Sequence, residues 1–163
     1  MDYNSLNKTL YSKAVQLLAQ RNHSTFELKQ KLSLFITKKS DNYHGNSDQI
    51  SHQIDAVIQY CLSRHWLDDN NYISQYIDIR VRKGYGKNRI FMELKQKGLD
   101  KSLILAVINQ KDIDWYQLAL NQVNKKFTNI NLRNIQQKSK INQYLLYRGF
   151  CQEEIRCILT LIS

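Results

Sequence analysis

Apolar residues recur every three or four positions along most of this chain, the spacing that places side chains on one face of an α-helix. The clearest stretch runs from Trp66 to Gly98, where the pattern predicts two helices joined by a Gly-Tyr-Gly connector. Asp68 is placed to cap the first helix, and Gly84 and Gly98 are placed to end the two helices. The apolar positions are Tyr72, Ile73, Tyr76 and Ile77 in the first helix and Ile90, Phe91 and Leu94 in the second.

The same periodicity predicts helices in the remaining chain, at about 6–20, 24–36, 48–64, 100–110, 114–126, 132–148 and a last one ending near 162. Ser24 and Glu27 fit a capping box, and Asp100 and either Asp112 or Asp114 can cap later helices. Residues 37–47 are polar and aperiodic, which predicts a loop. Proline is absent, and β-branched residues never alternate with polar ones over a strand length, so the fold is predicted to be all-α.

An internal repeat groups these helices in threes. The pentapeptide Glu-Leu-Lys-Gln-Lys at 27–31 recurs letter for letter at 93–97. The apolar frame Ile90, Leu94, Gly98 and Ile104 recurs with the same spacing as Ile141, Leu145, Gly149 and Ile155. We therefore predict three tandem three-helix repeats, at 1–64, 65–110 and 111–163. Because such units contact chiefly their neighbours, we expect an elongated array.

The charge of the chain favours an anionic partner. Its formal net charge is +10 and its pI is near 9.5, which suits nucleic acid, a membrane surface or an acidic protein. The three cysteines form no Cys-x-x-Cys pair, so we interpret them as buried thiols of a reducing compartment. The N-terminus lacks the pattern of a secretion signal and no stretch approaches a membrane span, so we expect a cytoplasmic protein.

Two cationic zones are separated along the sequence. The first contains Glu93 as its only acid, and its members are Arg80, Arg82, Lys83, Lys87, Arg89, Lys95 and Lys97. The second contains no acid, and its members are Lys125, Lys126, Arg133, Lys138, Lys140 and Arg148. Each zone can follow a phosphate backbone or match acidic patches on a protein partner, although a solvated helix face would have the same composition. We expect Arg82, Lys87 and Arg89 to be exposed.

The connector at 84–86 offers a local anion site. Free amides at the start of the following helix, together with Lys87 and Arg89, can hold a phosphate or a carboxylate. A plain glycine turn would look the same. Tyr85 is a further candidate contact that can stack on a base or pack beneath the turn, and we favour packing.

Catalytic and metal chemistry have little support in the sequence. The histidines at 23, 44, 52 and 65 lack metal-ligand spacing, and no nucleophile elbow is present. Asp68 and Asp69 are better explained as a helix cap than as a metal-binding pair. We therefore predict a protein that is not an enzyme and that holds no metal or cofactor.

Several motifs together resemble the RecX family of bacterial recombination regulators. They are Trp66-Leu67-Asp68-Asp69, Lys83-Gly-Tyr-Gly86, Glu93-Leu94, Lys97-Gly98-Leu99-Asp100 and Arg148-Gly-Phe150. The resemblance implies a small cytosolic, non-enzymatic protein of tandem three-helix repeats that binds the RecA recombinase and its nucleoprotein filament, and usually restrains RecA activity. We expect a monomer. The chain departs from the family pattern at His65-Trp66, where a glycine is common, and in an insertion around 40–47.

An alternative is a helix-turn-helix protein that acts directly on single- or double-stranded DNA. Reading base edges requires several Arg, Asn or Gln side chains on one exposed helix face. The candidates are Asn88, Arg89, Gln96, Asn134, Gln136 and Gln137. Lysine outnumbers them in these zones and suits phosphate better, so binding is expected to be sequence-tolerant.

Overall fold

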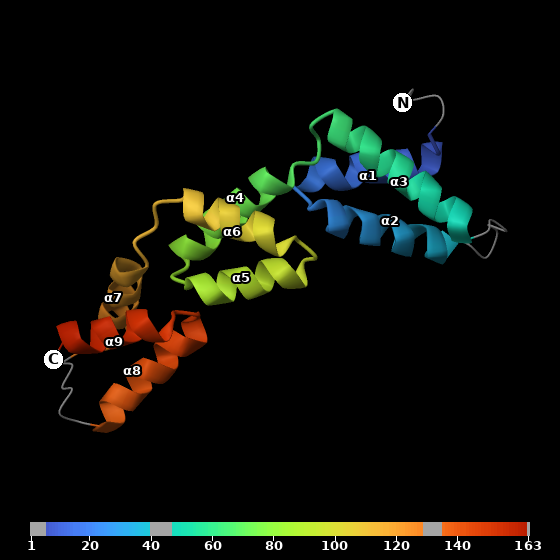
Figure 1. Cartoon of the computed structure of the whole chain (residues 1–163). Helices are drawn as coiled ribbons and strands as arrows, with labels where there is room; N and C mark the ends of the chain where they lie inside the picture. The colour runs from blue at the N-terminus through green and yellow to red at the C-terminus, as the bar shows by residue number, and fades with distance from the viewer. Residues whose placement is uncertain (1–5, 40–46, 129–134, 163) are drawn as a thin grey trace. The chain divides into compact units, whose positions relative to one another are not determined.

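The computed structural model describes residues 6–39, 47–128 and 135–162, and the regular structure within these ranges is entirely helical, as predicted (Figure 1). Residues 37–39 are helical, so the predicted loop begins later than expected. Its part at 40–46 and the predicted site residue Arg133 lie outside the described residues. The helices are α1 (Lys8–Gln20), α2 (Thr25–Lys39), α3 (Ser47–Ser63), α4 (Asp69–Arg82), α5 (Lys87–Gln96), α6 (Lys101–Gln110), α7 (Trp115–Lys126), α8 (Ile135–Arg148) and α9 (Gln152–Leu161).

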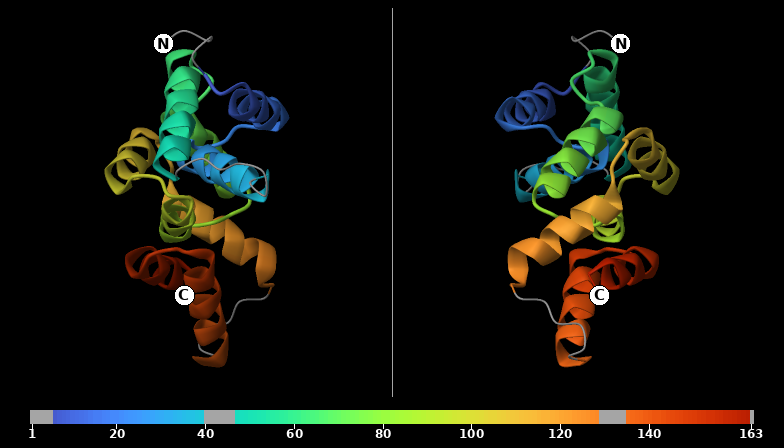
Figure 2. Two further views of the ribbon diagram at one scale, coloured as in Figure 1. Left: turned by 90° about the vertical axis from the view of Figure 1, so that its right-hand side faces the viewer. Right: turned by 90° about the vertical axis from the view of Figure 1, so that its left-hand side faces the viewer.

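The chain forms two compact units. The first contains α1, α2, α3, the start of α4 and the segment Lys97–Leu99; the second contains the rest of α4 and the helices α5 to α9. Within the first unit α1, α2 and α3 pack on one another, and within the second α7, α8 and α9 do the same (Figure 2). The predicted repeat boundaries after 64 and 110, and the elongated shape, stay predictions.

The first unit is a three-helix bundle whose local signals behave as the sequence indicates. The Ser24 hydroxyl accepts the Glu27 amide at 3.1 Å and caps α2, while the Glu27 carboxylate pairs with Arg21 and Lys31. Asn7 caps α1 by accepting the first amides of that helix. The core residues come from all three helices and include Leu10, Ala14, Leu28, Leu32, Ile54, Val57, Ile58 and Cys61.

The second unit buries one apolar face from each of its helices. At the start of α4, which belongs to the first unit, Asp68 accepts the Asn71 amide at 3.0 Å and confirms the predicted cap. Asp100 caps α6, and of the two candidates for α7 the cap is Asp114. The fully buried residues include Ile73, Ile77, Ile90, Leu94 and Ile104 toward its N-terminal side and Ala119, Val123, Ile141, Leu145 and Ile155 toward its C-terminal side.

Three helix ends share one hydrogen-bond pattern. One or two positions past the helix a residue takes a positive φ, and its amide donates to the carbonyl three positions earlier. The next amide donates to the carbonyl five positions earlier. Gly84 and Gly149 fill this position after α4 and α8 with φ of 76° and 91°, whereas His65 fills it after α3 with φ of 56°. Among the described residues His65 is the one non-glycine residue with positive φ. The departure at His65 therefore keeps the glycine geometry at a conformational cost.

The letter-for-letter pentapeptide does not mark equivalent positions. Glu27 lies in the first turn of α2, whereas Glu93 lies past the middle of α5. Short Lys- and Gln-rich segments suit any exposed helix, so identical letters can occur one turn apart. The apolar frame that contains Gly98 and Gly149 does mark equivalent positions, because both glycines take positive φ after the middle helix of a trio.

The expectation that all three cysteines are buried was wrong. Of the three cysteines only Cys61 is buried, whereas Cys151 is half-buried and Cys157 is exposed. Burial raises the pKa of Cys61 to about 11, so that thiol has little nucleophilic character.

Candidate partner-binding surface around Tyr85

The connector before α5 docks on the turn after α8. The Gly86 amide donates to the Arg148 carbonyl at 2.8 Å, and the Asn88 amide donates to the Gly149 carbonyl at 3.0 Å. A Cβ on Gly86 would lie 2.4 Å from the backbone of Gly149, so a glycine is required there. These contacts bring together two segments that are about 60 residues apart in sequence.

Two of the amides on which the predicted anion site at the start of α5 depends are already engaged, and the site stays a prediction. An anion site at a helix start needs amides that have no other acceptor. Here the amides of Gly86 and Asn88 already donate to the carbonyls that end α8. The glycine turn is therefore explained by close backbone approach.

Three guanidinium groups surround the ring of Tyr85, and we call Arg80, Tyr85, Arg89 and Arg148 the Tyr85 cluster. The Cζ atoms of Arg80, Arg89 and Arg148 lie 5.2, 4.3 and 5.1 Å from the ring centroid. All three distances are within the range of cation–π attraction. Tyr85 is half-buried, so it packs as expected, but its neighbours are cations.

Glu93 is the carboxylate that holds two of these cations. Its oxygens lie 2.7 Å from Nε of Arg80 and 3.1 Å from Nε of Arg89, and the Tyr76 hydroxyl donates to it at 2.8 Å. Burial alone would raise the pKa of Glu93. The bonds from Tyr76 and Arg89 and the two positive charges outweigh burial, and the pKa lies below its ordinary value.

Arg148 is held without a carboxylate in the described part of the chain. Its guanidinium donates to the Lys83 carbonyl at 2.9 Å and to the Tyr144 hydroxyl at 3.1 Å. With three guanidiniums and one carboxylate, the Tyr85 cluster and Glu93 together carry a net charge of +2 (3 − 1). The arrangement is therefore rigid and attracts anions.

Aromatic rings and cations alternate outward from Tyr85. Arg89 lies over both Tyr85 and Tyr147, and Arg148 lies over both Tyr85 and Tyr144. The ring of Tyr144 in turn carries Lys126, with Nζ 4.6 Å from the centroid. The order along this series is Tyr147, Arg89, Tyr85, Arg148, Tyr144 and Lys126. Members of both predicted cationic zones thus meet in one surface.

The other predicted contacts differ in exposure. Lys87 is half-buried and donates to Asn109 at 3.3 Å, and Lys97 is half-buried in the first unit. The expectation of exposure is confirmed for Arg82 but was wrong for Lys87 and Arg89. The Arg89 side chain is 29% exposed and is fixed by Glu93 and Tyr147. The exposed cations are Arg82, Lys83, Lys95, Lys125, Lys126, Lys138 and Lys140.

Three tyrosines of this surface were missed from the sequence. Tyr76 and Tyr144 each precede an arginine by four positions, at Arg80 and Arg148, and that spacing places them on the same helix face. The spacing of four positions between a tyrosine and an arginine could therefore have identified both tyrosines from the sequence. Tyr147 had no such signal, since its partner Arg89 comes from another helix.

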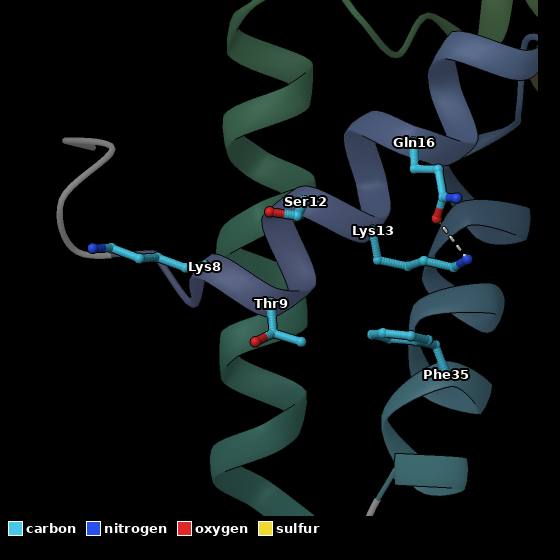
Figure 3. Close-up of a pocket in the computed structure, with 6 residues that line it drawn as sticks. All are labelled: Lys8, Thr9, Ser12, Lys13, Gln16 and Phe35. Atoms are coloured by element: carbon cyan, nitrogen blue, oxygen red, sulfur yellow. Dashed lines mark hydrogen bonds between the residues drawn. The ribbon is translucent and has the colours of Figure 1, made fainter.

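A second hollow with cationic lining lies between α1 and α2. It has a volume of about 540 Å³ and is lined by Lys8, Thr9, Ser12, Lys13, Gln16 and Phe35. Lys13 reaches toward Gln16 and the Phe35 ring, whereas Lys8 points away from them (Figure 3). Its two lysines do not converge, so the Tyr85 cluster is the better candidate.

The described ranges contain neither a candidate metal-binding group nor a candidate membrane-spanning helix. No group of three or more His, Cys, Asp or Glu side chains there could hold a metal ion. His23 is buried, with Nδ1 at 2.9 Å from the Arg21 carbonyl and Nε2 at 3.1 Å from Lys31. None of the helices described is both long and apolar enough to cross a membrane.

The fold and this surface define a class, the tandem three-helix proteins with a cationic face. Family models described as "RecX, second three-helix domain" and "RecX, third three-helix domain" match residues 68–108 and 112–159. The chain belongs to the RecX family, whose curated members are named regulatory proteins.

Relatives and solved structures agree with this assignment. Regulatory protein RecX of Yersinia pseudotuberculosis serotype O:1b is 41% identical, over 91% of this chain and 95% of that one. The Pectobacterium atrosepticum protein is 40% identical over 92% and 95%. The crystal structure of RecX from Lactobacillus salivarius has a TM-score of 0.74 at 21% identity, over 93% of both chains, which supports the fold.

Proposed function

We propose that this protein is a non-enzymatic, cytoplasmic regulator that binds the RecA recombinase and its nucleoprotein filament as a monomer. Binding lowers the recombinase's ATPase and strand-exchange activities, and with them the SOS-related activity of the filament. Membership of a family of regulatory proteins supports the regulatory role. The net positive charge of +10 supports an anionic partner.

The observation that carries the proposal is the convergence of the two cationic zones around Tyr85. A filament presents acidic side chains and phosphates in a fixed geometry, and arginines held in place lose less conformational entropy on binding such a surface. Arg82, Lys83 and Lys126 extend the surface with exposed charge. We therefore propose that these three side chains contact the filament directly.

A charge-reversal experiment tests this proposal. Arg82, Lys83 and Lys126 are replaced together by Glu, and the ATPase of the cognate recombinase on single-stranded DNA is measured as the variant is titrated in. Like-charge repulsion should abolish the inhibition that the wild-type protein causes.

The matched control reverses three exposed cations elsewhere, at Lys38, Lys101 and Arg156, and has the same net charge. It should inhibit like the wild type. Equal inhibition by both variants would place the contact elsewhere, and no inhibition by the wild type would end the proposal.

The helix-turn-helix alternative has less support. Of its candidate base-reading residues, Arg89 is fixed by Glu93 and Tyr147, and Asn134 lies outside the described residues. Gln136 belongs to the first turn of α8 and is exposed. A preference of the free protein for one duplex sequence over others would favour this alternative.

A further inference from the structure

Tyr147 ends the alternating series at the surface. It lies in the last turn of α8 and is 72% exposed, the most exposed tyrosine among the large hydrophobic side chains in the described ranges. The Arg89 guanidinium lies over its ring, with Cζ 5.0 Å from the centroid. A ring that is held on one side and exposed over most of its area is suited to stacking a flat group.

The position of this ring is fixed from beneath. Arg89 donates to the Tyr147 carbonyl at 3.1 Å and to Glu93 at 3.1 Å, and it also lies 4.3 Å from the Tyr85 centroid. Besides the Tyr147 ring, the Arg89 guanidinium therefore has three contacts: the Tyr147 carbonyl, the Glu93 carboxylate and the Tyr85 ring. A preorganised ring loses little conformational freedom when a ligand stacks on it.

The charge around the ring selects an anionic ligand. Arg89 lies over the Tyr147 ring, and Arg148 is the next residue in the sequence. The guanidinium of Arg148 donates to the backbone carbonyl of Lys83, which brings the exposed residue Lys83 close to Arg148. The nearby carboxylate of Glu93 is engaged by Arg80, Arg89 and Tyr76. An aromatic platform beside cations is the arrangement that binds single-stranded nucleic acid.

We propose that Tyr147 is a stacking platform for one unpaired base of single-stranded nucleic acid, with Lys83 and Arg148 contacting the adjoining phosphates. Bases in a duplex have both faces covered by their neighbours, so the platform selects single strands. This inference rests on the nucleic-acid part of the proposed function and adds the residue and the strand state.

A fluorescence experiment tests the stacking directly. In the full-length protein, Tyr147→Trp places an indole on the platform, and oligothymidylate is titrated in. Stacking should quench and shift the new emission. Tyr116→Trp is the matched control, because Tyr116 is a 42%-exposed tyrosine of the same unit next to acidic Glu153, and its emission should not change.

Two comparison ligands separate the possible partners. A duplex of equal length and polyglutamate should each leave the emission of the Tyr147→Trp protein unchanged at the same salt concentration. An equal response to polyglutamate would show that the ring faces an acidic protein, and an equal response to duplex would show plain charge attraction. Either result, or no response to oligothymidylate, would overturn the inference.

Affinity measurements complete the test. Tyr147→Ala should lower the affinity for oligothymidylate by about tenfold, while Tyr147→Phe should keep it, because stacking needs the ring and not the hydroxyl. Circular dichroism checks that both variants are folded. Recombinase inhibition by the wild type is measured in parallel. If the wild type inhibits but Tyr147→Ala keeps the wild-type affinity for oligothymidylate, the stacking platform alone is refuted. If Tyr147→Ala loses affinity but the wild type does not inhibit the recombinase, the proposed function alone is refuted.

Discussion

The arginines around Tyr85 and the lysines of α8 are two cationic regions of the same compact unit. They differ in how firmly their charged side chains are held. Each guanidinium of the Tyr85 cluster has a ring beneath it and a fixed hydrogen-bond acceptor. Lys138 and Lys140 are exposed, and no ion pair is found for them among the described residues. The first region can recognise geometry, whereas the second contributes charge that salt screens.

The largest expected effect is on stability, at Gly86, where the backbone of the connector contacts the turn after α8. Gly86→Ala would place a methyl group against the Gly149 backbone and separate the two turns. We expect a loss of about 3 kcal/mol in the free energy of unfolding, measured by urea denaturation. Lys87→Ala, at the next position, is the control and should change stability little. Equal stability of the Gly86→Ala protein would show that the turns do not need close approach.

A smaller effect is expected from Glu93→Gln, which leaves Arg80 and Arg89 without a carboxylate. Because these groups are partly exposed, the loss should be about 1–2 kcal/mol at neutral pH. The pKa of Glu93 is depressed in the folded protein, so its contribution is present above the ordinary value of 4.5 and disappears as pH falls through the lower folded value.

Unfolding measured from pH 7 to pH 3 should therefore show the wild type and Glu93→Gln converging toward acid. A difference that stays constant across this range would mean that the carboxylate charge does not stabilise the cluster.

The exposed lysines should affect binding and not folding. Replacing Lys138 and Lys140 by Ala should leave urea unfolding unchanged. If both contact phosphates, the slope of log K against log salt for single-stranded DNA should become shallower by about 1.4 units, at roughly 0.7 for each phosphate contact that is lost. An unchanged slope would show that this part of α8 is a solvated face.

An effect confined to stability, with none on binding, is expected at a position outside both regions. His65→Gly removes a side chain from a left-handed residue, and we expect it to stabilise the fold by about 1 kcal/mol in thermal unfolding. Recombinase inhibition should not change. Altered inhibition in this variant would mean that changes in stability confound the binding results in the two cationic regions.

Local features of the fold could be predicted from the sequence. The caps at Asp68 and Asp100 and the helix ends at Gly84 and Gly149 depend on neighbours within a few residues, so they are visible in a single sequence. The periodic apolar faces likewise depend on spacing within one helix. The repeated pentapeptide misled, because exposed helix surfaces reuse the same polar letters.

The candidate site could be predicted only in part. The charge of the two zones was evident, but their meeting depends on backbone contacts between Gly86 and the end of α8, which no local pattern encodes. For the same reason the sequence predicts neither the burial of Arg89 nor the place of Tyr147 in this surface. Which cations are fixed and which are available is a property of tertiary packing.

The most direct measurement is recombinase inhibition by a protein whose cluster has lost only its central ring. Tyr85→Leu keeps an apolar side chain in the connector but removes the surface over which three guanidiniums lie. With folding verified by circular dichroism, its titration into the cognate recombinase's ATPase on single-stranded DNA should give greatly weakened inhibition compared with the wild type. Full inhibition by the folded Tyr85→Leu protein would contradict the assignment of the Tyr85 cluster as the organising element of the binding surface.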